Sequence, residues 1–177
     1  MACAPLHRRS DPLLELLLGG RADLAGGTVD LWPLYLFHAG ALTLNFALEI
    51  LTTCRITPLA GSSIELRSLD TGREETFADL SELTDCKKPR HPLAAWTVRF
   101  FAPGRGFRLE TNSESPAGAG ISGSSALMIA TSAALARFTG RDLDLEQLRV
   151  IAQNIENANH RTIWELNSPP LSDVQVA

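Results

Sequence analysis

Residues 114–138 read ESPAGAGISGSSALMIATSAALARF, and this stretch decides which kind of fold the chain can adopt. Its second half is rich in alanine, which predicts a helix over Ser124–Phe138 that Gly140 closes. Its first half gathers glycines and serines directly before that helix. Because the first N–H groups of a helix lack partners and carry a partial positive charge, an anion is the natural ligand at this position.

The composition of the loop favours a phosphate chain as that anion. Glycine carries no Cβ that would keep a phosphate oxygen from the backbone amides, and serine hydroxyls can bind phosphate or a magnesium ion. The residues concerned are Gly118, Gly120, Ser122, Gly123, Ser124 and Ser125. A plain turn with a serine cap is the alternative, but such a turn needs only one serine and one glycine.

Two other phosphate-binding loops fit the sequence less well. The P-loop pattern G-x-x-x-x-G-K-[ST] is excluded, because no lysine follows Lys88. Residues 118–123, GAGISG, match the dinucleotide pattern G-x-G-x-x-G, which requires a buried strand directly before it. The preceding residues 111–117, TNSESPA, are polar and contain Pro116, so a dinucleotide-binding oxidoreductase remains only an alternative.

The rest of the chain predicts a strand-rich first part and a helical second part. Asp11, Pro12 and the leucines up to Leu18 predict a short helix that Gly19 and Gly20 end, followed by an extended piece over 21–25. Alternating residues predict a strand over 41–50, a hairpin turning at 70–72 and a strand over 107–111. Helices are predicted over 92–101 and 145–158, the latter with a capping box of Asp144 and Gln147. This order indicates an α+β fold, a mostly antiparallel sheet with helices in a second layer.

Charge and cysteine content exclude several classes of protein. The net charge of −4 and the lack of a basic stripe argue against nucleic-acid and membrane-surface binding. The apolar run Leu13–Leu18 contains Glu15 and is too short to span a membrane. Three widely spaced cysteines suggest neither a disulfide framework nor a zinc site, so we expect a protein of the reducing cytoplasm.

Two motifs carry a resemblance to a known family. Residues 116–125, PAGAGISGSS, resemble the phosphate-binding motif P-x-x-x-G-[LI]-x-[SG]-S-[SA] of the GHMP kinases, which include galactokinase, homoserine kinase, mevalonate kinase and phosphomevalonate kinase. Residues 21–35, RADLAGGTVDLWPLY, resemble the substrate motif of the branch that contains heptose-phosphate kinases and fucokinases. The resemblance implies the family's two-layer N-terminal domain, which we place at 20–160 between an extension with a short helix (1–19) and an irregular tail (161–177).

The resemblance implies transfer of a phosphoryl group from Mg-ATP to a hydroxyl of a sugar or sugar phosphate. Ile121 joins the six glycines and serines as an ATP phosphate-binding residue, and Ser124, Ser125 and Glu156 are the implied magnesium ligands. Arg21 resembles the family's catalytic arginine, which lies near the transferred phosphate or the catalytic carboxylate. A surface residue at a strand edge is the alternative for Arg21. Gly26, Gly27 and Asp30 are the candidate substrate-binding residues, because a carboxylate after two glycines suits the capture of sugar hydroxyls. Asp30 could instead cap a turn before Pro33.

The chain departs from the family pattern near its end. The family's catalytic aspartate would fall near residues 165–170, which read ELNSPP, and Asp173 lacks the glycines that would orient it. Complete members are about twice as long, so we expect a truncated chain with little or no activity, because half of a two-domain cleft is missing. The alternative function is that of a non-catalytic remnant that binds nucleotide or sugar. We also expect self-association, through the surface that a second domain would cover.

Overall fold

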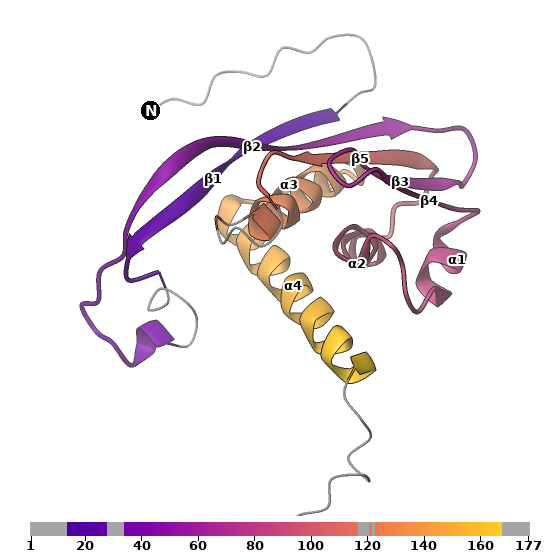
Figure 1. The fold of residues 1–177 in the computed structure, drawn as a ribbon. Coiled ribbons are helices and arrows are strands. Elements are labelled where there is room, and N and C mark those ends of the chain that lie inside the picture. The colour runs from indigo at the N-terminus through magenta and orange to yellow at the C-terminus, as the bar shows by residue number, and fades with distance from the viewer. Residues whose placement is uncertain (1–13, 28–33, 117–120, 122, 168–177) are drawn as a thin grey trace, which may run out of the picture.

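The polypeptide forms a five-stranded sheet with its main helices packed against one face, as Figure 1 shows. The computed structural model describes residues 14–27, 34–116, 121 and 123–167. The strands are β1 (Leu14–Ala25), β2 (Leu44–Pro58), β3 (Ile64–Ser68), β4 (Arg73–Phe77) and β5 (Phe107–Ser113). The helices are η1 (Leu34–Leu36), α1 (Leu80–Asp85), α2 (Pro92–Phe101), α3 (Gly123–Phe138) and α4 (Leu145–Asn167).

The strand order is β1-β2-β5-β3-β4, which places the last strand in sequence at the centre of the sheet. The β1–β2, β2–β5 and β3–β4 pairs are antiparallel, and β3 and β5 pair in parallel. The predicted α+β class with a mostly antiparallel sheet is therefore confirmed.

The core lies between the inner face of the sheet and helices α2 and α3. Buried and less buried residues alternate along β3 and β5, because successive side chains of a strand point to opposite faces. Cys54 of β2 is part of this core, and burial raises the pKa of its thiol to about 12. The thiol of Cys54 is therefore protonated at neutral pH and a poor nucleophile.

Helix α3 is the central element of the helical layer. It packs against β1, β2 and β5 of the sheet and against both α2 and α4. Small residues such as Ala130 and Ala134 are fully buried, which lets the neighbouring elements approach the helix closely. The alanine-rich composition thus serves packing as well as helix propensity.

The helix predicted near the N-terminus is wrong, because Leu14–Leu18 belong to β1. This strand pairs with β2 along its length, and Leu16 and Leu18 pack against the core. Gly19 and Gly20 lie inside the strand and do not end a helix. A Cβ on Gly19 would stand 3.1 Å from the carbonyl oxygen of Leu48, so a close approach of two backbones explains a glycine there.

The remaining predicted elements are confirmed, with different bounds for two of them. The hairpin turn at 70–72 joins β3 to β4, and α2, β5 and α3 begin and end within two residues of their predicted bounds. Strand β2 continues past residue 50 to Pro58, and α4 continues past Ala158 to Asn167, into the segment predicted as an irregular tail. The predicted capping box is present: Gln147 donates its N–H to Asp144 Oδ1 (2.8 Å), and Asp144 donates to Gln147 Oε1 (3.0 Å).

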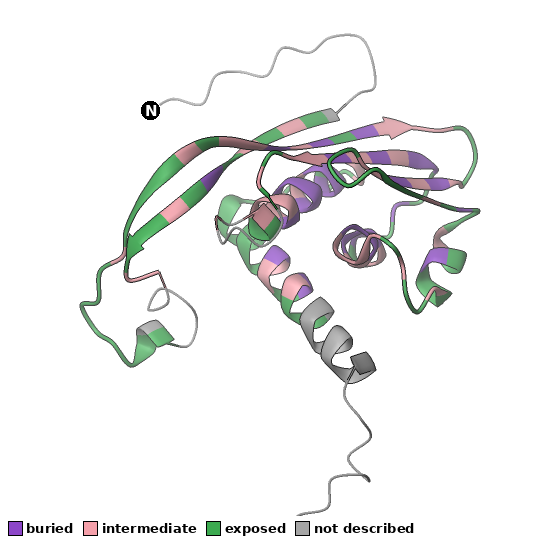
Figure 2. Ribbon diagram, in the orientation of Figure 1, coloured by how far each residue is buried: buried purple, intermediate pink, exposed green. Residues whose placement is uncertain are grey.

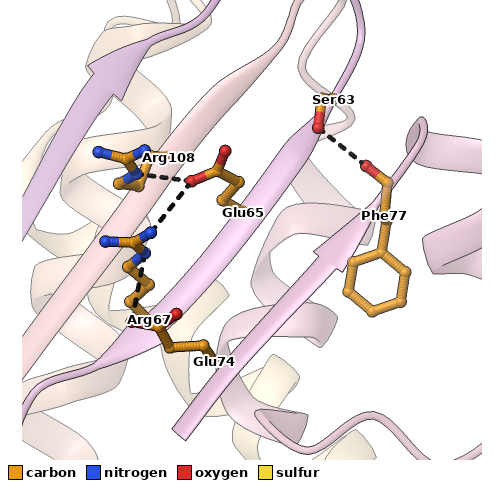
Figure 3. Close-up of polar contacts among 6 residues, drawn as sticks. All are labelled: Ser63, Glu65, Arg67, Glu74, Phe77 and Arg108. Atoms are coloured by element: carbon orange, nitrogen blue, oxygen red, sulfur yellow. Dashed lines mark hydrogen bonds and ion pairs between the residues drawn. The ribbon is translucent and has the colours of Figure 1, made fainter. Parts of the chain in front are cut away.

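The outer face of the sheet carries charged residues that oppose each other across the strands (Figure 3). The register aligns Glu15, Arg55, Glu110, Arg67 and Glu74 in one row across all five strands. Arg108 Nε donates to Glu65 Oε2 over 2.6 Å, and this hydrogen bond raises the pKa of Arg108. Because the charges alternate along the row, each side chain has opposite charge on every strand that neighbours its own, which keeps this face polar.

Candidate functional site

The candidate site is the N-terminal end of α3, where four of the predicted phosphate-binding residues are described. Ser124 and Ser125 are exposed on the first turn of the helix, whereas Gly123 and Ile121 are partly buried. The remaining three, Gly118, Gly120 and Ser122, lie outside the described residues. The exposed first turn offers unpaired backbone N–H groups together with two hydroxyls, the donors that an anion requires.

A chain of hydroxyl groups fixes the end of β5 next to the start of α3. Thr52 and Ser113 share a hydrogen bond of 3.2 Å between their hydroxyls, and Ser113 Oγ also accepts the N–H of Ser115 (3.3 Å). A Cβ on Gly123 would lie only 2.8 Å from Ser115 Oγ. Any larger residue at position 123 would therefore push the loop away from the helix.

Glu114 ties the same segment to β2 through two hydrogen bonds with one residue. The N–H of Leu51 donates to Glu114 Oε2 (2.8 Å), and the N–H of Glu114 donates to the Leu51 carbonyl oxygen (3.0 Å). The sequence analysis gives Glu114 no role, although this carboxylate is the first residue of the stretch 114–138 and stands two residues before Pro116. The side chain closes the ladder between β2 and β5 at the point where the glycine-rich segment begins.

The start of the upstream motif lies close to the phosphate motif, because Gly20, the residue before Arg21, approaches Ile121. A Cβ on the buried Gly20 would lie 3.3 Å from the Ile121 carbonyl oxygen, so β1 runs directly past the end of the glycine-rich segment. Arg21, the first residue of the upstream motif, follows Gly20 on the same strand. The fold thus brings together two residues that are 101 positions apart in sequence.

The upstream motif forms the end of β1 and the turn after it. Arg21 and Asp23 form an ion pair with Nε–Oδ1 at 2.9 Å and Nη2–Oδ2 at 3.1 Å. A Cβ on Gly27 would stand 2.5 Å from Asp23 Oδ2, so Asp23 contacts both the arginine and the glycine turn. Sequence reasoning missed Asp23, and its spacing of two residues from Arg21, which puts both on one face of a strand, could have revealed it.

Glu156 lies on α4, near the place where this helix crosses the first turns of α3. Met128 of α3 packs with Ala152 and Ile155 of α4, and Glu156 directly follows Ile155. The described residues contain no group of three or more histidine, cysteine, aspartate or glutamate side chains that could hold a metal ion. The donors at hand are two serine hydroxyls and one carboxylate, oxygen ligands that suit magnesium when phosphate oxygens and water complete its shell.

Two further candidate residues, Asp30 and Asp173, also lie outside the described part of the chain, so their predicted roles stay predictions. No helix of the described residues combines the length and apolar character that crossing a bilayer would require.

One family model matches the segment of the chain that contains the start of α3 and Glu156. Residues 90–163 match the model described as GHMP kinases N terminal domain, which covers α2, β5, α3 and most of α4. The sequence resemblance to GHMP kinases is thereby confirmed. No match was found among curated proteins.

Solved structures of GHMP kinases share the fold at low sequence identity. The mevalonate kinase of Methanococcus jannaschii is 15% identical with a TM-score of 0.65 over 90% of this chain and 48% of its own. The D-glycero-D-manno-heptose 1-phosphate kinase of Bacteroides thetaiotaomicron is 19% identical, with a TM-score of 0.67 over 84% of this chain and 49% of its own. The galactokinase of Lactococcus lactis, solved with galactose, is 20% identical, with a TM-score of 0.66 over 84% of this chain and 38% of its own. The chain therefore spans half or less of the length of these structures.

Proposed function

We propose that this chain is the ATP-binding N-terminal half of a small-molecule kinase that transfers the γ-phosphoryl group of ATP to a hydroxyl of a sugar or sugar phosphate. The observation that carries the proposal is the close approach of Gly20 to Ile121, because it brings the start of the upstream motif next to the phosphate motif. A kinase needs its donor and acceptor sites within reach of each other, whereas two unrelated structural turns do not.

On the donor side, the first turn of α3 holds the phosphates. Its amides and the hydroxyls of Ser124 and Ser125 donate hydrogen bonds to phosphate oxygens, and Ser124, Ser125 and Glu156 would hold the magnesium ion. When bound, magnesium neutralises the charge that develops on the phosphates during transfer. A neighbouring structure, the phosphomevalonate kinase of Streptococcus pneumoniae, was solved in complex with phosphomevalonate and AMPPNP, which supports ATP as the donor.

On the acceptor side, Arg21 and the turn at Gly26 and Gly27 frame the proposed sugar site. We assign Asp30 to the sugar hydroxyls and Arg21 to the transferred phosphate, with Asp23 holding the guanidinium of Arg21 in place. Sugars are favoured over other alcohols because the upstream motif, residues 21–35, resembles that of the branch containing heptose-phosphate kinases and fucokinases.

The second candidate is a binding protein without turnover. Residues 165–170, where a catalytic aspartate is expected, contain none in the sequence, and α4 continues to Asn167 within this segment. We therefore expect the 177-residue polypeptide, assayed alone, to bind Mg-ATP and to transfer phosphoryl groups slowly or not at all.

The test measures nucleotide and sugar binding separately. Ser124→Ala combined with Ser125→Ala should weaken Mg-ATP binding by about tenfold or more and leave galactose binding unchanged. Asp30→Ala should do the reverse. The control is Ser81→Ala, an exposed serine of α1 far along the chain from both motifs.

Binding is followed by NMR at the amides of residues 123–125. If Mg-ATP at millimolar concentration leaves these amides unmoved, the phosphate site is not there. Equal loss of nucleotide and sugar binding in the double serine variant would also contradict the assignment.

A further inference from the structure

A pocket lies at the opposite end of α3 from the proposed phosphate site. It is open to the surface and has a volume of about 400 Å3 between the loop after α2 and the loop after α3. The lining residues that matter for its chemistry are Phe101, Gly104, Arg105, Phe138, Thr139 and Arg141. Because α3 has 16 residues, the two sites are separated by roughly 24 Å along the helix axis.

Two arginines of the lining are held in place by aromatic rings. The guanidinium of Arg105 stacks 4.4 Å from the ring centre of Phe138. The guanidinium of Arg141 lies 5.2 Å from the ring of Phe101, and its Nη2 donates to the Phe101 carbonyl oxygen over 3.3 Å. A guanidinium stacked on a ring keeps N–H groups at its edge, and these suit the oxygens of a carboxylate or phosphate.

Neither guanidinium is neutralised by the protein. The pocket lining contains no aspartate or glutamate, and within the described part of the chain Arg105 and Arg141 form no ion pair. Arg55 and Arg108, by contrast, each face a glutamate at 3.1 Å or less. In a chain of net charge −4, two unpaired cations in one pocket form a local basic site.

The ends of α2 and α3 also meet here, and the partial negative charge of helix C-termini opposes anion binding. Several of the terminal carbonyls already accept hydrogen bonds: Val98 from the N–H of Ala102, Ala136 from the N–H of Arg141, and Phe101 from the Arg141 side chain. These hydrogen bonds reduce the partial negative charge at the two helix ends. The two full positive charges of the arginines are larger than the partial charge that is left.

The loop that carries Arg105 is fixed at both ends. Ala102 has φ of 46° and is the only non-glycine residue with a positive φ in the described part of the chain. At the other end, the N–H of Gly106 donates to the Gly61 carbonyl oxygen (2.7 Å), and Leu59 donates to the Gly106 carbonyl oxygen (3.0 Å). An alanine in the left-handed backbone conformation is strained, whereas a glycine would not be. Such backbone strain is typical of loops whose conformation serves a function.

We propose that this pocket binds a small organic anion with two carboxylate or phosphate groups, one for each arginine. Its volume lies within the range of about 300–1,000 Å3 that small-molecule sites occupy. The site is independent of the proposed kinase function, because it shares no residue with the start of α3.

The test is an NMR titration of the 177-residue protein with pyrophosphate and, separately, with succinate. Saturable shifts are expected at the amides of Gly104, Arg105 and Thr139, and added salt should weaken them. Shifts with pyrophosphate alone identify a phosphate ligand, and shifts with succinate alone identify a dicarboxylate. The double variant of Ser124 and Ser125 to alanine should keep these shifts, which separates this pocket from the nucleotide site.

Variants decide whether the arginines bind the anion. Arg105→Gln and Arg141→Gln should each weaken binding by about tenfold, whereas Arg149→Gln on α4 should not change it. Arg105→Gln is the primary variant, because within the described residues the Arg105 side chain contacts Phe138 and forms no backbone hydrogen bond that the fold would lose. The proposal is overturned if no amide of the pocket responds at about 10 mM of either anion, or if Arg105→Gln binds as well as the unaltered protein.

Discussion

Gly26 adopts a backbone conformation that other residues rarely accept. Its φ is +76°, and a Cβ at this position would overlap the carbonyl oxygen of Leu42. The carbonyl oxygen of Gly26 accepts the hydroxyl of Thr43 over 2.9 Å. Sequence analysis attributed the glycine pair to ligand approach, but the described contacts give Gly26 a structural reason within the chain itself. Its predicted role in substrate binding stays a prediction.

Gly26→Ala should therefore destabilise the fold by about 2–3 kcal/mol, through both the positive φ and the overlap with Leu42. The matched control is Gly72→Ala, because Gly72 also has a positive φ of 64° but faces open space. The control should cost only about 1 kcal/mol. Urea denaturation of both variants measures the difference, and equal losses would show that the contact with Leu42 is unimportant.

His91 makes stability depend on pH. Burial and the charge of Arg73 lower the pKa of His91 below its ordinary value of 6.5, although Glu75 and Asp70 act in the opposite direction. Its Nε2 is buried and has no hydrogen-bond partner in the described part of the chain. The folded state therefore favours the neutral imidazole, while the unfolded chain takes up a proton near pH 6.5.

Stability is thus expected to be full above pH 6.5 and to be lost as the pH falls through the lowered pKa of His91. His91→Gln should remove part of this loss when urea midpoints at about pH 7.5 and about pH 5.5 are compared. His38→Gln, on the exposed segment after η1, serves as the control. An unchanged pH dependence in His91→Gln would assign the effect to other groups.

At the scale of single elements, the sequence predicts features that depend on contacts between residues close together in the chain. The capping box of Asp144 and Gln147 and the turn at 70–72 depend on residues within a few positions, so the sequence contains the whole interaction. Strand β1 shows the limit of this approach. Its leucines have a good helix propensity, but they are held by β2 residues about forty positions away, and the glycines that looked like a helix end allow close backbone contacts.

The segment before α3 gives a prediction about Glu114. Glu114→Gln keeps an oxygen that can accept the Leu51 N–H, whereas Glu114→Ala leaves that amide without its partner. Glutamine should therefore preserve Mg-ATP affinity, or raise it, because it removes a negative charge near the proposed phosphate site. Alanine should weaken Mg-ATP binding by about tenfold.

Thermal melts are recorded beside the nucleotide titrations. A loss of stability in Glu114→Ala without a loss of nucleotide affinity would limit this residue to a structural role. If the glutamine variant behaves like the alanine variant, the hydrogen bond to Leu51 is not what matters.

At the scale of the whole molecule, the ends of β1 and β2 project beyond the helical layer (Figure 1). This arm, comprising residues 21–27 and 34–47, is largely exposed, as the green colour in Figure 2 shows. Its apolar side chains include Phe37 at 75% exposure and Leu42 at 87%. Exposed apolar groups gathered on one arm mark a surface that favours association.

We therefore expect the isolated protein to self-associate through the arm. The double variant Phe37→Ser and Leu42→Gln should reduce the concentration dependence of the sedimentation coefficient. Leu145→Gln is the matched control, since Leu145 is 86% exposed at the start of α4. Association that persists in the arm variant would exclude this surface.

The sequence predicts a chemistry for the candidate site but not how the site is assembled. The serines and glycines before α3 indicate phosphate from their own properties, and this stays a prediction. The contact of Gly20 with Ile121 and the bond of Glu114 to Leu51 depend on how β1, β2 and β5 lie beside each other. No periodicity within either motif carries that information, because it is set by the order of strands in the sheet.

That order has a consequence for biosynthesis. During synthesis, the β1–β2 and β3–β4 pairs can each form as soon as both of their strands have been synthesised. The two pairs are joined only when β5 inserts between β2 and β3. Until residue 113 has left the ribosome, both hairpins keep an open edge that other strands could join. Synthesis of this domain thus includes an interval of vulnerability to misassembly, which ends when the last strand closes the sheet.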